Sequence, residues 1–160
     1  MYKSYAEAVR EWLTAYRRDE DGIDERIEQI RALRERVMSV GAQVITDMPR
    51  APSVSGDSMT EYIIRLEALE AGLSREEKQH EMDRRIIVDL SSRLRKRDER
   101  QIIRERYLNG RDWSDVLMEV YRYEEGFSAM REAYRRRMYR AHESALEQLG
   151  KMWGTKSNPV

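Results

Sequence analysis

The sequence predicts an all-α protein, and three observations carry that prediction. Only three of its 160 residues are proline and eight are glycine, so few positions interrupt a helix. Apolar residues recur at spacings of three and four along most of the chain, which is the periodicity of amphipathic helices. A hydrophobic share of 40% beside a charged share of 38% is typical of helices with narrow apolar stripes. We expect N-terminal antiparallel helices, one of them long and coiled-coil-like, followed by a C-terminal helix-turn-helix domain.

Two helices are expected before a single long loop. The first spans about residues 3–19 and the second about 23–39, and each carries an apolar stripe with helical spacing. The loop covers 40–58 and contains two of the three prolines. The stripe residues are Tyr5, Val9, Trp12, Leu13 and Tyr16 in the first helix, and Ile23, Ile27, Ile30, Leu33 and Val37 in the second.

A long helix should follow, from about residue 58 to residue 95. Ser58 and Glu61 form a capping-box pattern at its start. Stripes this narrow do not close a core alone, so this helix pairs either with 23–39 in the same chain or with a partner chain in a coiled coil. We prefer self-association, and expect residues 1–95 to form the oligomerisation or partner region of a homodimer. The apolar positions of the long helix are Ile63, Leu66, Leu69, Leu73, Met82, Ile86, Leu90 and Leu94.

Shorter helices are expected in the second half. Residues 98–108 form the first of them, and Asn109-Gly110 closes it as a C-cap. Asp112 has the position of an N-cap for the next helix. The predicted core positions of this half are Ile102, Ile103, Leu108, Trp113, Val116, Leu117, Val120, Tyr134, Met138, Ala141, Ala145 and Leu149.

A turn and a longer basic helix complete the expected domain. Residues 122–130 read as a turn around Gly126, and the last helix spans about 128–150. The helix-turn-helix domain is therefore expected over 96–150, with a flexible tail over 151–160.

The charges are divided unevenly between the two halves. Residues 1–92 hold 14 Lys and Arg against 19 Asp and Glu, whereas residues 93–160 hold 16 against 11. The net charges are −5 and +5, which suggests that only the second half meets a polyanion. Chance clustering of charges on solvated faces is the alternative.

The composition leaves little support for catalysis or for a metal centre. Without cysteine, disulfides and thiolate metal sites are excluded. The two histidines, His80 and His142, lie 62 positions apart and form no HExxH motif. No glycine-rich phosphate loop or nucleophile elbow is present. We therefore expect no enzymatic activity, no cofactor and no metal.

The sequence also gives no sign of a membrane segment. No apolar run approaches the roughly 18 residues that span a bilayer. The first residues, MYKSYAEAVREWL, are too charged for a signal peptide. We expect a cytoplasmic protein that does not bind a membrane.

The last helix is the candidate DNA-reading element. Three short helices that end in a longer basic one fit the helix-turn-helix plan, in which the last helix enters a major groove. Arginines there supply phosphate contacts and bidentate contacts to guanine, and a tyrosine packs on a sugar or a thymine methyl. An arginine-rich solvated helix face is the alternative. The candidate residues are Arg135, Arg136, Arg137, Tyr139 and Arg140.

A second basic cluster lies just before and within the first short helix. We predict phosphate contacts from Arg97, Arg100 and Arg104. Alternatively, the aliphatic parts of these arginine side chains cover apolar surface at a helix junction and bind no ligand. The whole cluster consists of Arg93, Arg95, Lys96, Arg97, Arg100 and Arg104.

Several segments resemble a known family. They are MPRAPSVSGDSM with the long helix after it, ERQIIRERYLNGRDWSDVL, and YRRRMYRAHESALEQL. Bacteriophage-encoded transcriptional regulators of the ArpU and RinA type look like this, and their C-terminal part is similar to the promoter-reading helix-turn-helix of primary sigma factors. The matching positions are Arg106-Tyr107, Trp113, His142 and Ala145-Leu146.

The resemblance implies a phage or prophage DNA-binding regulator, similar to a late-gene activator, in the cytoplasm of a bacterial host. It would bind double-stranded promoter DNA through its last helix, and its N-terminal helices would dimerise or contact host RNA polymerase. Two other functions stay open. One is a small terminase-like DNA-packaging subunit, and the other is a helical interaction or scaffolding protein without a nucleic-acid ligand.

One interval differs from the family pattern. Trp113 lies 21 residues before Tyr134, about twice the family's interval between this tryptophan and the start of the recognition helix. The surplus falls in 121–132. Either the supporting helix is longer than in the family, or the recognition helix starts earlier, at about Ser128.

Overall fold

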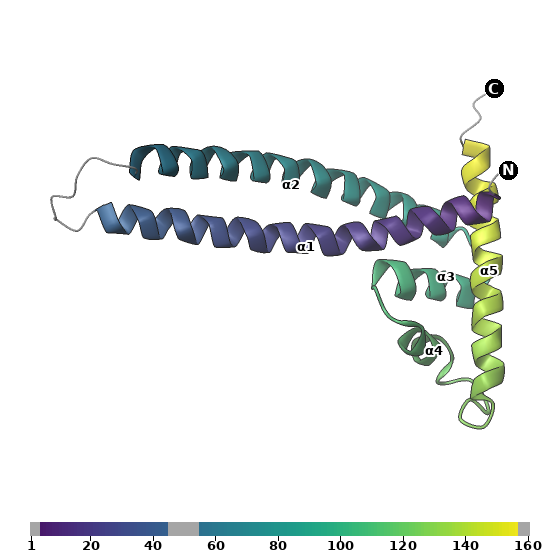
Figure 1. Ribbon diagram of the computed structural model, residues 1–160. Coiled ribbons are helices and arrows are strands. Elements are labelled where there is room, and N and C mark those ends of the chain that lie inside the picture. The colour runs from purple at the N-terminus through teal and green to yellow at the C-terminus, as the bar shows by residue number, and fades with distance from the viewer. Residues whose placement is uncertain (1–3, 45–54, 157–160) are drawn as a thin grey trace. The chain divides into compact units, whose positions relative to one another are not determined.

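The computed structural model describes residues 4–44 and 55–156, with side-chain burial for 4–39 and 59–154. The described residues form helices and contain no strand, so the predicted all-α class is confirmed. In chain order the helices are α1 (Tyr5–Val44), α2 (Ser55–Ser92), α3 (Arg97–Ile103), the π-helical turn η1 (Arg104–Leu108), α4 (Trp113–Tyr121) and α5 (Arg131–Lys156) (Figure 1).

The chain divides into two compact units. Residues 1–18 and 82–160 form one, and residues 19–81 form the other. The first holds 22 Lys and Arg against 15 Asp and Glu, a net charge of +7, and is called the basic unit. The second holds 8 against 15, a net charge of −7, and is called the acidic unit. This division does not coincide with the expected boundary at residue 96, because both α1 and α2 contribute to the basic unit.

The two helices predicted before the loop are one continuous helix, α1. A lone glycine inside a helix costs only about 1 kcal/mol relative to alanine, so Gly22 does not end it. At the other end of the loop, α2 begins at Ser55. The predicted cap Ser58 therefore lies inside the helix, and the capping-box prediction is wrong. The segment between α1 and α2 is shorter at both ends than the predicted loop over 40–58. Residues 45–54 lie outside the described part.

Within the acidic unit, α1 and α2 pair as an antiparallel hairpin. Arg26 forms an ion pair with Glu76, and Arg34 forms one with Glu70. The residue number of the α2 partner decreases as the residue number in α1 increases, as it does between antiparallel helices. The pairing within one chain that we left open beside the coiled coil is thus present here. Among the described residues of this unit, only Ile30 and Leu33 are buried apolar side chains.

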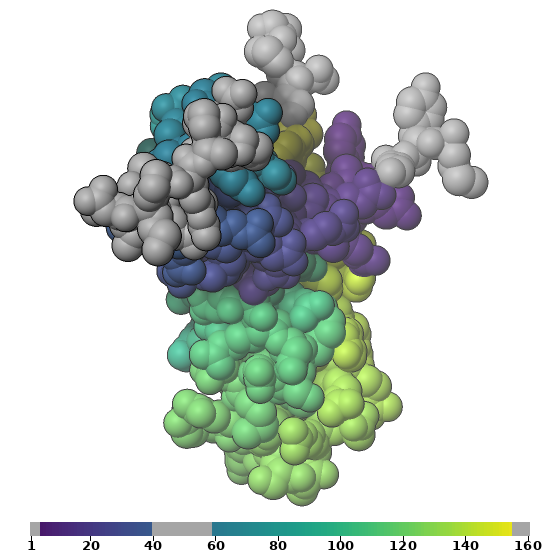
Figure 2. Space-filling model, turned by 60° about the vertical axis from the view of Figure 1, so that its left-hand side comes forward, coloured from purple at the N-terminus to yellow at the C-terminus, as the bar shows by residue number. Residues whose placement is uncertain are grey.

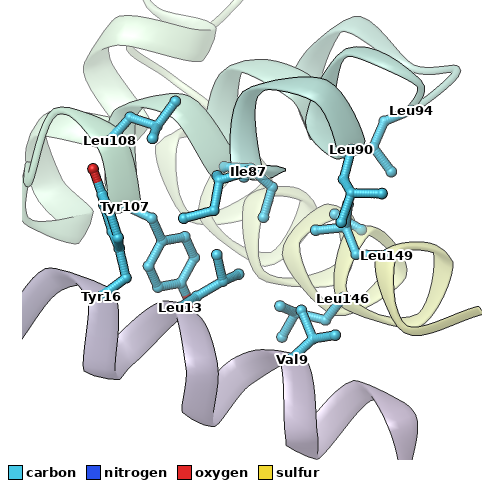
Figure 3. Close-up of a cluster of buried hydrophobic side chains, with 12 residues drawn as sticks. Val9, Leu13, Tyr16, Ile87, Leu90, Leu94, Tyr107, Leu108, Leu146 and Leu149 are labelled. Atoms are coloured by element: carbon cyan, nitrogen blue, oxygen red, sulfur yellow. The ribbon is translucent and has the colours of Figure 1, made fainter. Parts of the chain in front are cut away.

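The basic unit has a core that draws on both ends of the chain. Val9 and Leu13 of α1 meet Leu90 of α2 and Leu146 of α5 (Figure 3). Leu13 is fully buried, and at ~25 cal/mol per Å² of apolar surface such residues contribute roughly 1.5–3 kcal/mol each. The first turns of α1 are therefore an integral part of this unit. The full cluster is Val9, Leu13, Tyr16, Ile87, Leu90, Leu94, Ile103, Tyr107, Leu108, Ala145, Leu146 and Leu149.

The C-terminal apolar stripe predicted for α2 is partly wrong. Leu90 is buried as predicted, but Met82 and Ile86 are 58% and 39% exposed. Ile87, which we did not predict, is buried in their place. Ile87 and Leu90 lie three residues apart on one face of α2, whereas Ile86 lies one residue off that face; Leu94 is also buried, just beyond the end of the helix.

A second core cluster holds α4 against α3 and α5. Its members come from every helix of the predicted helix-turn-helix domain, and they include most of the core positions expected there. In Figure 2 the surface formed by α3, α4 and the first turns of α5 is continuous. The cluster is Ile102, Val116, Leu117, Tyr121, Phe127, Met138 and Ala141, with Trp113, Val120 and Tyr134 packed against it.

The predicted helix ends around α4 are confirmed. Asp112 accepts a hydrogen bond from the backbone N–H of Asp115 at 2.9 Å, as an N-cap does. Gly110 has a φ of +66°, which favours glycine after a helix. It also lies beneath Arg17 of α1, whose guanidinium carbon would be 2.0 Å from an added Cβ.

Helix α5 is longer than predicted at its C-terminal end. It continues to Lys156, so most of the expected flexible tail is helical, and residues 157–160 lie outside the described part. Trp153 packs against Trp12 of α1 with ring centroids 4.4 Å apart. Gly150 permits this crossing, because a Cβ there would lie 2.8 Å from the backbone of Tyr5.

Candidate nucleic-acid interface

The first three turns of α5 present two arginines to solvent while the opposite face is buried. Met138 and Ala141 face the second core cluster. Arg136 and Arg140 are exposed, and neither has an ion pair or a hydrogen bond with a described residue. Residues four apart on a helix lie about 6 Å from each other on one face. The two guanidinium groups therefore form an adjacent, uncompensated pair of positive charges.

Arg137 is engaged within the protein. Its guanidinium lies 3.7 Å from the carboxylate of Asp98 in α3 and 5.4 Å from the ring centre of Tyr121 in α4. The Tyr121 hydroxyl donates to the same carboxylate at 3.1 Å. Burial first, and then the neighbouring Asp98 charge, raise the pKa of Tyr121 far above its usual value, so the phenol keeps its proton. Arg137 thus joins α5 to α3 and α4, and it is the weakest of the predicted DNA contacts on this helix.

Arg135 and Tyr139 lie on the flank of α5 that faces α4. Arg135 is 3.8 Å from Glu132, one turn earlier. The Tyr139 ring meets Trp113 edge-on at 5.3 Å and stays 44% exposed. Tyr139 can therefore contact a ligand with its outer edge, while Arg135 is partly compensated by its acidic neighbour.

The second basic cluster is not brought together as one surface. Arg100 donates to the backbone oxygens of Leu94 and Arg95 at 2.6 and 2.8 Å, just beyond the end of α2. It satisfies backbone carbonyl groups of the connection between α2 and α3, which explains it without a ligand. Arg97 and Arg104 are exposed and have no ion pair with a described residue.

An open groove of about 860 Å³ joins Arg97 to the arginines of α5. It lies between the start of α3, the end of α4 and the first half of α5, and Lys96, Arg97 and Arg140 line it. Arg104 is not among its lining residues. We call Lys96, Arg97, Arg136 and Arg140 the basic track. Lys96 was not among the DNA contacts predicted from the sequence, because nothing there distinguishes it from the five other basic residues of its cluster.

Most of the acidic side chains that line this groove already have a partner within the protein. Asp98 is held by Arg137 and Tyr121, as described above. Glu119 lies 3.3 Å from Arg111. Glu124 also lines the groove, and it is exposed without a partner among the described residues. Of the acidic side chains that line the groove, Glu124 is thus the one left to compensate the cations of the track.

A buried carboxylate fixes α5 against α3. Glu99 is fully buried, and its two oxygens accept hydrogen bonds from Ser144 Oγ at 2.8 Å and Gln148 Nε2 at 3.0 Å. A buried acceptor without partners would cost about 1–3 kcal/mol. These bonds hold α5 one and two turns beyond Arg140, so the orientation of the track depends on them.

His142 has a structural position on the buried side of α5. Its Nε2 lies 2.8 Å from the Tyr107 hydroxyl, and its ring meets Trp113 edge-on at 4.8 Å. Burial first, and then the Arg10 and Arg106 charges, lower the pKa of His142 to about 4. Glu143 lies 4.0 Å from Nδ1, but it is itself paired with Arg10, which explains why it does not reverse the shift. The imidazole is therefore neutral near pH 7.

The connection between α4 and α5 accounts for the surplus residues. Helix α4 ends at Tyr121, so the alternative of a longer supporting helix is wrong. Helix α5 begins at Arg131, which is earlier than Tyr134, as the second alternative expects, but three residues after Ser128. The predicted turn around Gly126 is present, with a φ of +72°. Phe127 anchors it in the second core cluster, and the Tyr134 hydroxyl donates to the backbone oxygen of Glu125 at 2.8 Å.

Comparison with models of known families, with curated proteins and with solved structures found no significant match to this chain. Among the described residues, no group of three or more His, Asp or Glu side chains is placed to hold a metal ion. No helix in the described part has the length and apolar character required to cross a bilayer.

Proposed function

We propose that this protein is a DNA-binding transcriptional regulator that contacts double-stranded DNA through the basic track. One observation carries the proposal: Arg136 and Arg140 face solvent without compensating carboxylates, on a helix that two core clusters hold from behind. Ordering long side chains and leaving like charges adjacent are both unfavourable. A polyanionic ligand offsets these costs.

The groups of the basic track, and Tyr139 beside them, are suited to different parts of a duplex. Arg136 and Arg140 project from the first half of α5, where a helix in a major groove reads base edges and phosphates. Tyr139 supplies an edge for a sugar or a thymine methyl. Lys96 and Arg97 begin α3 and line the adjoining groove, where backbone phosphates are the expected partners. Phosphate contacts give salt-dependent affinity, and base contacts give sequence preference.

The charge division supports separate tasks for the two units. The basic unit, at +7, is attracted to DNA, whereas the acidic unit, at −7, is repelled by it. The acidic unit is then available to a protein partner, and host RNA polymerase is the partner that the family resemblance suggests. The phage origin and the role as a late-gene activator rest on that resemblance.

Selection of bound duplexes from a random pool tests this proposal directly. We expect recovery of a shared sequence motif from the full-length chain at about 50 mM salt, and loss of binding as salt rises. Binding with no enriched motif and a ring-shaped oligomer in the electron microscope would favour the packaging subunit instead. Absence of duplex binding at low salt would overturn the proposal in favour of a scaffolding protein.

A further inference from the structure

The acidic unit carries a regular stripe of carboxylates on α1. Asp21, Asp24, Glu25 and Glu28 are all exposed, and their spacings of three and four place them on one face of the helix. We call these four residues the acidic stripe. They extend over about 10 Å, because each helical residue advances the chain by about 1.5 Å.

The centre of the acidic stripe is uncompensated. Asp24 and Glu25 have no ion pair or hydrogen bond with a described residue. Glu28 lies 3.1 Å from Arg31, one turn further along the same helix. The ion pairs of Arg26 and Arg34 use Glu76 and Glu70 of α2, so they leave Asp24 and Glu25 uncompensated.

The acidic stripe and the basic track have matching spacing. Asp21 and Glu25 are four residues apart, as are Asp24 and Glu28, and so are Arg136 and Arg140. Each pair therefore separates its charges by about 6 Å on a helix surface. Two such helices lying side by side can form adjacent Arg–carboxylate pairs, which are among the stronger charged hydrogen bonds.

We infer that the acidic stripe of one copy docks on the basic track of a second copy, on the surface proposed for DNA. Two acidic units repel each other and so do two basic units, whereas unlike units attract at −7 and +7. Exposed ion pairs contribute little individually and are screened by salt. The contact is thus weak, is favoured by high protein concentration and low salt, and is displaced by DNA.

Only the displacement by DNA rests on the proposed function; the docking itself does not. Two charge-reversed variants separate the partners: D24R/E25R removes the stripe, and R136E/R140E removes the track. All four residues are exposed, so both variants are expected to melt at nearly the wild-type temperature, which circular dichroism checks.

Sedimentation at low salt then measures association without DNA. The wild type should self-associate, and the apparent dissociation constant should rise at least tenfold in each variant. An equimolar mixture of the two variants should form a complex, because the stripe of one and the track of the other are intact. Raising the salt to about one molar, where the Debye length is about 3 Å, should dissociate it.

Monomeric wild type at low salt, or two variants that remain separate when mixed, would overturn the docking. Association that persists at high salt and in both variants would also overturn it, in favour of an apolar dimer. A separate titration with duplex DNA distinguishes the proposed function: docking without DNA binding refutes only the regulator, and DNA binding by a chain that never self-associates refutes only the docking.

Discussion

The two units of this chain are stabilised in different ways. In the basic unit, two clusters of buried side chains connect α1, α2, α3, α4 and α5. In the described part of the acidic unit, Ile30 and Leu33 are the buried apolar residues, and ion pairs such as Arg34–Glu70 cross between the helices. The unit with the thick core can therefore hold side chains in fixed positions for a ligand, whereas the hairpin offers an extended charged surface.

The first prediction contrasts core truncations in the two units. Leu13→Ala in the basic unit should cost about 3–5 kcal/mol, because Leu13 is fully enclosed by several helices. Leu33→Ala in the acidic unit should cost about 2 kcal/mol or less, because water and neighbouring side chains can fill the space that the truncation leaves between two helices. Chemical denaturation of each variant measures both values. Equal costs would show that the two units are packed alike.

A pH titration tests the buried histidine of the basic unit. His142 has a folded pKa of about 4, against about 6.5 in an unfolded chain. As the pH falls, the unfolded state binds the proton first, so the stability due to neutral His142 is complete above pH 6.5. It should decrease by roughly 3 kcal/mol between pH 6.5 and 4. Denaturation of wild type and His142→Gln side by side isolates this contribution; parallel pH curves would contradict the assignment.

Removal of the buried carboxylate tests what orients the basic track. Glu99→Ala should destabilise the fold by about 1–3 kcal/mol, because Ser144 and Gln148 lose their acceptor. Glu99→Gln keeps an oxygen and should cost less. Thermal melts followed by circular dichroism give the ranking, and a glutamine variant as unstable as the alanine variant would argue against the hydrogen-bond explanation.

Two glycines should respond with opposite signs. Gly22→Ala in α1 should stabilise the chain by up to about 1 kcal/mol, because nothing lies within 4 Å of the added Cβ and the site is helical. Gly110→Ala should destabilise it by about 1–2 kcal/mol, because its φ is +66° and Arg17 must move. The difference in melting temperature between the two variants measures this, and a shift of the same sign in both would refute it.

Local patterns in the sequence were sufficient for the fold class and for the helix ends around α3, η1 and α4, but not for the ends of α1, α2 and α5. Asp112, Gly110 and Gly126 were correctly placed, because each acts locally: Asp112 caps the helix three residues on, and the two glycines adopt a positive φ. The spacing of apolar residues identified Leu13, Leu90 and Leu117 as core. It misplaced the burial near Ile86, because Ile86, Ile87 and Val88 are adjacent and only the packing of the neighbouring helices selects which of them is buried.

The domain boundary and the site depend on contacts between distant segments. Nothing in the first residues shows that they pack on α5, so the true charge separation between the units, +7 and −7, could not be derived from a split into halves. Likewise, all the arginines of α5 look alike in the sequence. Arg137 differs from Arg136 only because Asp98 lies beside it, and Lys96 joins the basic track only because α3 meets α5.

The salt dependence of DNA affinity tests the central claim most directly. The wild type, R136A/R140A and the matched control R36A/R75A are titrated with one duplex at several salt concentrations; the control removes the same charge from exposed positions of the acidic unit. We predict that R136A/R140A binds at least tenfold more weakly and that its slope of log K against log salt is smaller by about 2, while the control matches the wild type. An affinity and a slope unchanged in R136A/R140A would contradict the assignment of DNA binding to the basic track.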